Sequence, residues 1–393
     1  MAEIDIKIEH DGILHPNKTI DIERHNEEVK VLWDDFNNKR NKRIPISFDT
    51  DESLWLDISG HTFKEFYTDP YIHLKTQLLG KAWFCQNVFS DAAAGLPDQW
   101  TIGVTHWMDD NLFFGCEVEI QEHDFAWGMP LDMNKNDIIS YINDVDVERT
   151  ITQMPSHDLF VQMSELAEDK TFLGRPIKVY PLGNGNAGIF TKTAEIWGLE
   201  RICIDMAEDP DFAERLITAF ADKLLAKIFA HRKAIERVSG APCGNPFIGD
   251  DSIQMISKDM YDFFLLPCHE KLYSAIPGIK DRYIHLCGPA MQHYESLHRK
   301  LGVKYIDGPG LFADHAYYLN RFDSDFRFQA QLDNSVILFG AEAEIDSMLT
   351  KLINDDVKQP GRFDIRSYAP RGVNIKNIEH CYASAIELGK ISA

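Results

Sequence analysis

The chain has 393 residues, of which 44% are hydrophobic, and this is enough to form one large α/β domain or two ordinary ones. Its 62 acidic and 40 basic residues give a formal charge of −22, which argues against nucleic acid or an anionic membrane as a partner, because both attract basic surfaces. The seven cysteines are scattered, the N-terminus has no apolar targeting segment, and no apolar run approaches the roughly 20 residues of a membrane span, so a cytoplasmic protein with free thiols is expected.

A polar, charged segment comes first and predicts a helical arm over residues 1–43, followed by a main domain over residues 44–393. In the main domain, short apolar strands alternate with amphipathic helices. The predicted strands are Arg43–Asp49, Phe113–Ile120, Ile177–Leu182, Asn245–Asp250, Arg282–Cys287, Val303–Asp307, Ser335–Gly340 and Arg362–Ser367. The predicted helices are Asp209–Val238, Ser257–Ile276, Glu342–Asp355 and Asn377–Gly389. This alternation, with no fixed-period repeat, predicts one (β/α)8 TIM barrel with an N-terminal helical extension.

Polar residues follow most of the predicted strands. Active sites of such barrels are built at the carboxyl ends of the strands, so we expect these residues to converge on one rim. The candidates are Asp49, Asn184, Asn186, Asp250, Asp251, His285, Cys287, Asp307, Tyr368 and Arg371.

Several of these candidates also have a purely structural interpretation. Asp250 and Asp251 precede a helix entry, where an acidic residue caps the helix as readily as it contacts a ligand. Asn184 and Asn186 lie in a glycine-flanked turn, and Asn-Gly pairs form turns by their own chemistry. Asp307 precedes a Gly-Pro turn in the same way.

The stretch "YIHLCGP" contains a His-x-Cys pair, His285 and Cys287, at the end of a predicted strand. Imidazole and thiolate are the ligands that Zn²⁺ prefers, but a single pair at this spacing also occurs at ordinary strand ends. The pair alone therefore predicts a position at the rim and leaves a metal site open.

Five segments occur in the order and spacing of one known family. They are "RIPISFD", "NAGIFTKTAEIWGLERICIDMAEDPDFAERLI", "DDSIQMISKDMYDFFLLPCHEKL", "IHLCG" with "LGVKYIDG", and "YAPRGVNIKNIEHCYASA". From about residue 40 onward the chain thus resembles the uroporphyrinogen decarboxylase superfamily. The resemblance implies a (β/α)8 barrel and one of two activities, which are decarboxylation of uroporphyrinogen and methyl transfer to or from the cobalt of a corrinoid protein.

The resemblance distinguishes the two branches by particular positions. The decarboxylases hold a substrate rich in carboxylates with arginines of the opening loop, whereas Ser47–Trp55 has three acids and no arginine here. The methyltransferases bind zinc through His-x-Cys and a later cysteine. His285 and Cys287 match the first two ligands, but the third position falls near Ser367. An oxygen ligand would then complete the site, and the candidates for it are Asp307, Glu342 and Asp250.

The missing cysteine weakens the case for a zinc-bound thiolate nucleophile and favours an aryl methyl ether as the methyl donor, as in the first methyltransferase of O-demethylase systems. The expected catalytic residues, which stabilise charge on the ether oxygen, are His285, Tyr368, Arg371 and Asp250. The expected contacts to substrate or corrinoid are Asn184, Asn186, Asp251, Asp307 and Asp49.

The chain carries no Asp-x-His-x-x-Gly corrinoid motif, so the corrinoid is expected on a partner protein that docks at the rim. Zinc is a second expected cofactor, at His285 and Cys287. A homodimer is compatible with the sequence. The alternatives are a zinc-dependent methylcobalamin:thiol methyltransferase, a decarboxylase of the uroporphyrinogen type, and a non-enzymatic module that binds a corrinoid carrier.

Overall fold

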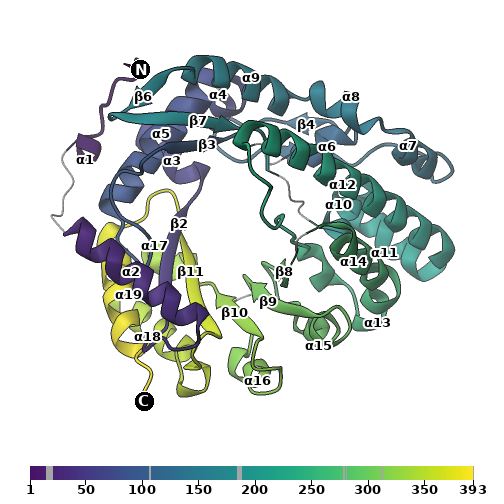
Figure 1. The fold of residues 1–393 in the computed structure, drawn as a ribbon. Helices are drawn as coiled ribbons and strands as arrows, with labels where there is room; N and C mark the ends of the chain where they lie inside the picture. The colour runs from purple at the N-terminus through teal and green to yellow at the C-terminus, as the bar shows by residue number, and fades with distance from the viewer. Residues whose placement is uncertain are drawn as a thin grey trace.

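The structure is a computed structural model that describes residues 1–14, 21–105, 108–183, 188–277, 279, 281–309, 311 and 313–392. Helices and strands alternate along the chain, and the helices lie outside the strands (Figure 1). The α/β class predicted from the sequence is therefore confirmed. Within the described part of the chain, no helix has both the length and the apolar character needed to cross a bilayer.

The described residues form the following elements. The strands are β1 (Ala2–Glu3), β2 (Ile46–Thr50), β3 (Trp100–Gly103), β4 (Val118–Glu119), β5 (Trp127–Gly128), β6 (Lys170–Phe172), β7 (Arg175–Tyr180), β8 (Arg282–His285), β9 (Val303–Asp307), β10 (Arg327–Ala330) and β11 (Phe363–Ala369). The α-helices are α1 (Asp11–Leu14), α2 (Ile22–Asn37), α3 (Glu52–Ser59), α4 (Phe63–Thr68), α5 (Pro70–Asn87), α6 (Asp109–Phe113), α7 (Ile138–Asp144), α8 (Val147–Thr152), α9 (Pro155–Ala167), α10 (Ile189–Thr193), α11 (Leu199–Glu208), α12 (Pro210–Ser239), α13 (Lys258–Met260), α14 (Leu266–Ala275), α15 (Tyr294–Arg299), α16 (His315–Leu319), α17 (Asn334–Phe339), α18 (Glu342–Leu352) and α19 (Ile375–Leu388). Short 3₁₀ and π turns cover Ala194–Gly198, Asp251–Met255, Tyr261–Leu265, Met291–His293 and Asp355–Val357.

Five strands form a fully parallel sheet in the order β2-β11-β10-β9-β8. The sheet is extended past β8 by the segment at Gly249, which pairs in parallel with His285. A second sheet has the order β1-β6-β7-β3, with β3 and β7 parallel. Hydrogen bonds among the described residues do not join the two sheets into a closed ring, so the barrel itself stays a prediction.

The five-stranded sheet has two faces of opposite character. Its outer face is apolar and buried, as at Phe328, Ile365 and Ile306, and it packs against helices such as α15, α17 and α19. Since side chains alternate along a strand, the residues between these point to the other side. That inner face includes Asp49, Tyr283, His285, Tyr305, Asp307, Arg327, Gln329, Asp364, Arg366 and Tyr368. A polar inner face predicts a ligand-binding interior, because an ordinary core would be apolar there.

The predicted strand Asn245–Asp250 is reduced to an isolated bridge at Gly249, and two other predicted strands are wrong. The segment predicted as Ser335–Gly340 is helix α17, because Asp333 caps it by accepting the Ser335 N–H at 2.9 Å. The segment predicted as Phe113–Ile120 begins at the end of α6, and only β4 in it is a strand, paired with β5. The strands that were overlooked, β1, β3, β5, β6 and β10, have two to four residues each and carry too little pattern to recognise.

The four predicted helices are all present. Asp209–Val238 is α12, and Glu342–Asp355 begins as α18. Ser257–Ile276 contains α13 and α14 with a π turn between them. Asn377–Gly389 is the larger part of α19.

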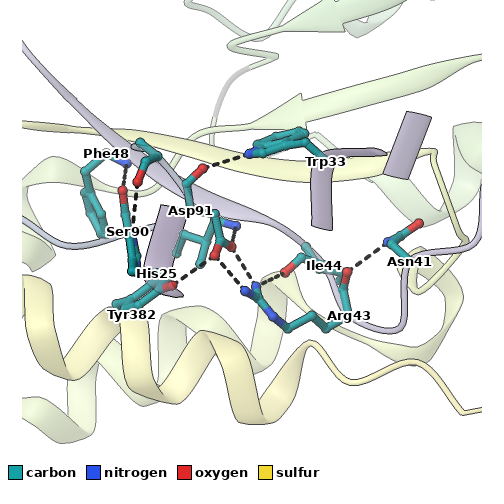
Figure 2. Close-up of polar contacts among 11 residues, drawn as sticks. His25, Trp33, Asn41, Arg43, Ile44, Phe48, Ser90, Asp91 and Tyr382 are labelled. Atoms are coloured by element: carbon teal, nitrogen blue, oxygen red, sulfur yellow. Dashed lines mark hydrogen bonds and ion pairs between the residues drawn. The ribbon is translucent and has the colours of Figure 1, made fainter. Parts of the chain in front are cut away.

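The predicted N-terminal arm packs against the main body through a buried polar network around Asp91 (Figure 2). The Asp91 carboxylate accepts two hydrogen bonds of 2.6 Å from the Arg43 guanidinium and one of 2.9 Å from the Tyr382 hydroxyl. Its backbone carbonyl accepts the Trp33 indole N–H of α2 at 2.7 Å. One carboxylate thus links the arm, the start of β2 and the C-terminal helix α19.

Candidate functional site

Three side chains meet at the carboxyl edge of the five-stranded sheet in an arrangement that suits a metal ion. The ligand atoms of Asp251, His285 and Cys287 all lie within 4.8 Å of one another. His285 Nε2 is 2.7 Å from Cys287 Sγ, and the Cys287 N–H donates to Asp251 Oδ1 at 2.7 Å. We call this group the Asp251–His285–Cys287 cluster.

Asp307 at the end of β9 orients the imidazole of the cluster. Its Oδ1 lies 2.7 Å from His285 Nδ1, so Nδ1–H donates to the carboxylate and Nε2 faces Cys287. The register of the sheet causes this contact, because His285 and Asp307 are direct partners on β8 and β9. A carboxylate behind a histidine that fixes its tautomer is the usual support of a metal-binding imidazole.

The cluster perturbs the pKa values of its members. Burial alone would lower the pKa of His285, but hydrogen bonding to Asp307 and Cys287 and their charges outweigh burial and raise it to about 10. Burial raises the pKa of Asp251, against the opposing effect of the Cys287 N–H. Without a metal, the cluster therefore keeps a proton that a bound cation would displace.

Asp250, which the sequence predicts as catalytic, lies behind the cluster. Its side chain is fully buried and accepts the backbone N–H groups of Phe190 and Thr191 at 3.0 and 2.8 Å. It also accepts the Thr191 hydroxyl at 2.9 Å, and His269 Nε2 lies 3.2 Å away. This carboxylate holds the start of α10 in place, and its contacts among the described residues are to backbone and side-chain groups of the protein.

The predicted residues of β2 and β11 lie on the opposite side of the inner face. Tyr368 and Asp49 are partners in adjacent strands, and Asp49 forms an ion pair with Arg366. Burial raises the pKa of Tyr368, so its phenol keeps its proton at neutral pH. Arg371 lies further out, 3.4 Å from Asp57 of α3, and is not brought to the cluster.

The remaining predicted positions divide into three cases. Asn184 and Asn186 lie outside the described residues. Glu342, a candidate third ligand, is exposed at the start of α18, a helix that packs on α17 and α19. Ser367, at the place of the missing cysteine, is buried on the outer face and donates to Asn334 at 3.3 Å. The third ligand that the structure offers is therefore Asp251.

Six of the inner-face residues named above were not predicted as site residues, namely Tyr283, Tyr305, Arg327, Gln329, Asp364 and Arg366. The Gln329 amide donates to the Asp364 carboxylate at 2.6 Å. Arg366 and Asp364 lie two and four residues before Tyr368 on β11. Because side chains two residues apart on a strand share one face, both could have been predicted from Tyr368.

No protein-family profile matches the sequence, and neither does any curated protein. Solved structures do resemble the fold. One is a methyltransferase from Methanosarcina mazei, with a TM-score of 0.59 and 12% sequence identity over 91% of this chain and 97% of that chain. At this identity the likeness establishes a shared fold over nearly the whole of both chains.

Proposed function

We propose that the protein is a methyltransferase that moves a methyl group from an aryl methyl ether to the cobalt of a corrinoid held by a partner protein. The observation that carries the proposal is the Asp251–His285–Cys287 cluster at the carboxyl edge of a parallel sheet. The shared fold with a protein described as a methyltransferase, and the sequence resemblance to the corrinoid-dependent branch, support it.

The proposal includes the (β/α)8 barrel that the resemblance implies. In such a barrel, β2, β3, β7, the segment at Gly249, β8, β9, β10 and β11 would be the eight strands, and they occur in this order along the chain. In such a barrel the corrinoid partner would dock at the carboxyl edge, above the cluster.

The donor atoms of the cluster fit a zinc ion. His285 Nε2, Cys287 Sγ and an Asp251 carboxylate oxygen would be its three ligands, which leaves one position of a tetrahedral site for substrate. Asp307 already holds His285 in the tautomer that such binding needs. When bound, the metal would supply a Lewis acid for the ether oxygen.

The ligand types favour an ether over a thiol as the substrate. A site with one sulfur, one nitrogen and one oxygen ligand is a stronger Lewis acid than a sulfur-rich site, which instead supports a nucleophilic thiolate. In ether cleavage, the bond between the methyl carbon and the oxygen breaks, and its electron pair stays on the oxygen. The protonated Tyr368 phenol is a suitable donor to that oxygen.

Decarboxylation of a substrate with many carboxylates fits the site less well. At the carboxyl edge, the Arg366 and Arg371 guanidinium groups are both paired with acids, Asp49 and Asp57. Asp51 of the same opening loop caps α3 through the Ser53 N–H. These pairs neutralise the cations that would have to clamp the substrate.

The test is a single-turnover assay with a reduced corrinoid protein and a panel of methoxyaromatic compounds. We expect the cobalt(I) absorption to disappear with formation of one equivalent of the phenol, and a chelator to stop the reaction. No spectral change with any methoxyaromatic would contradict the proposal. Demethylation of methylcobalamin by a thiol would support the thiol methyltransferase instead, and release of carbon dioxide from uroporphyrinogen would support the decarboxylase.

A further inference from the structure

A cavity of about 480 Å³ lies at the amino edge of the five-stranded sheet, at the opposite end of the inner face from the Asp251–His285–Cys287 cluster. Its lining includes Tyr283, Tyr305 and Arg327, which are inner-face residues of β8, β9 and β10. Phe36 and Lys39, at the end of the N-terminal arm, also line it. This volume is within the range of sites for small organic ligands.

Arg327 is the unusual member of this cavity. Its guanidinium lies over the Tyr305 ring, 4.1 Å from the centroid. Among the described residues, Arg327 has no hydrogen-bond or ion-pair partner, although its charge opposes the rise in the pKa of the Asp364 carboxyl. The other cations of the cavity are occupied, since Lys304 pairs with Asp325 and Lys39 donates to the Ser324 carbonyl at 2.8 Å.

A partly buried guanidinium whose N–H groups have no hydrogen-bond partner among the described residues has donors ready for an oxyanion. The planar fork of arginine pairs with carboxylate or phosphate through two parallel hydrogen bonds, and stacking on a tyrosine fixes its orientation. Two acids also line the cavity, Asp281 and Asp325, and Asp325 is paired with Lys304. The preference for an anionic group is therefore local to the part of the cavity beside Arg327.

The walls beside Arg327 suit a flat organic body. The Tyr283 and Tyr305 rings have centroids 5.9 Å apart and are tilted by 33°. Phe36, which is buried, adds a third aromatic side chain from α2. Aromatic walls around one cation favour a small aromatic anion over inorganic phosphate.

The cavity is separated from the metal-like cluster by a layer of inner-face residues. Asp307 and Gln329, with Asp364 beside Gln329, lie at the same level of the register as His285 of the cluster, and Asp307 and Gln329 are two residues further along their strands than Tyr305 and Arg327. A ligand at the amino edge therefore does not occupy the proposed substrate position.

We propose that this cavity is a second binding site, which takes a small aromatic carboxylate or phosphate monoester with its oxyanion on Arg327 and its ring beside Tyr283 and Tyr305. It is independent of the proposed methyl transfer, since none of the cluster residues lines it. The ligand would also contact the end of the N-terminal arm through Phe36.

The test is calorimetric titration of the full chain with benzoate, phenyl phosphate, inorganic phosphate and benzylamine. We expect one benzoate or phenyl phosphate per chain, weaker binding of inorganic phosphate, and no binding of benzylamine. Arg327→Gln should weaken binding of the aromatic anion by about tenfold or more, because a charge-assisted bidentate contact is lost.

The matched control is Arg321→Gln, since Arg321 also lies over a tyrosine, Tyr317, but outside the cavity. It should leave the affinity unchanged. Arg327→Lys keeps the positive charge but loses the bidentate guanidinium, so a partial loss of affinity for the aromatic anion is expected. This variant replaces Arg327→Gln if that protein does not fold. Absence of binding for both aromatic anions at about 5 mM, which is a free energy near −3 kcal/mol, overturns the proposal. So does an equal loss in the Arg321 control, or equal affinity for inorganic and phenyl phosphate.

Discussion

Two acidic groups of this protein, Asp91 and Asp251, lie in polar clusters of opposite kinds. Asp91 is buried, and both of its carboxylate oxygens are saturated by Arg43, Tyr382 and the Ile46 N–H (Figure 2). Asp251 is only partly buried, and its carboxylate accepts the backbone N–H of the exposed Cys287 at 2.7 Å. A carboxylate whose oxygens are all hydrogen-bonded stabilises the fold, whereas one with acceptor positions left over is suited to bind a metal ion or a ligand.

The largest expected effect is the loss of metal and turnover in Cys287→Ser. Removing a ligand should weaken zinc binding by more than the roughly 10–100-fold that loss of a supporting residue costs. Because Cys287 is exposed, the free energy of unfolding should hardly change. Metal analysis of the purified protein checks this, with Cys203→Ser as the control for a partly exposed thiol elsewhere. If the two variants contain the same amount of zinc per chain, the cluster is not the metal site.

The second effect should appear in stability and not in the site. Asp91→Asn leaves the Arg43 guanidinium without its countercharge, and breaking a buried pair in this way costs about 3–5 kcal/mol. Urea denaturation measures it, and zinc content per folded molecule should stay constant. Asp222→Asn, which breaks an exposed pair with Lys271, is the control and should cost less than about 1 kcal/mol. A comparable loss in the two variants would mean that the Asp91 network does not anchor the arm.

Asp364 is an intermediate case, a buried carboxyl on the inner face with one amide partner. Burial raises its pKa to about 6, above the ordinary value of 3.8 in the unfolded chain. The folded state therefore binds the proton more tightly, and stability falls as pH rises from about 4 to 6. The shift of about two pKa units corresponds to about 3 kcal/mol.

Asp364→Asn tests this shift because the amide does not titrate. We expect the variant to gain up to about 3 kcal/mol relative to the wild type between pH 4 and pH 7.5, measured by urea denaturation at both pH values. A difference that is the same at the two pH values would show that Asp364 titrates normally.

The contrast between Asp250 and Asp251 marks the limit of the sequence argument. Both follow the same predicted strand, and the sequence alone gives each the same two interpretations. Gly188 decides between them, because a Cβ there would lie 2.3 Å from the Gly249 carbonyl oxygen, so the start of α10 packs directly on Asp250. That contact joins positions some 60 residues apart and leaves no local pattern.

Other parts of the site were accessible to reasoning from strands. His285, Cys287 and Asp307 were predicted at the carboxyl edge from the ends of two apolar runs, and the parallel register brings His285 and Asp307 together. Arg371 was placed with them because it follows the last strand, but its side chain turns outward to Asp57. The ends of parallel strands predict which residues lie on the same edge of the sheet. They do not predict the direction of a side chain in the loop that follows.

The smallest effect concerns the residue that supports the cluster without belonging to it. Asp307→Asn keeps an acceptor for His285 Nδ1 but removes the negative charge that raises the basicity of the imidazole. We expect zinc affinity to fall by about 10–100-fold, as for other residues behind metal-binding histidines, with little change in stability. Competition with a chromophoric chelator measures the affinity.

The control for this substitution is Asp323→Asn. Asp323 also lies beside a histidine, 3.4 Å from His298 Nε2, but that histidine is not part of the cluster. It should leave the zinc affinity unchanged. If Asp307→Asn also leaves it unchanged, the contact between Asp307 and His285 belongs with the Asp91 network as a structural one. If instead it lowers the zinc affinity as far as Cys287→Ser does, Asp307 acts as a direct ligand. Asp307 would then belong with Asp251, as a carboxylate that binds the metal, and not with Asp91.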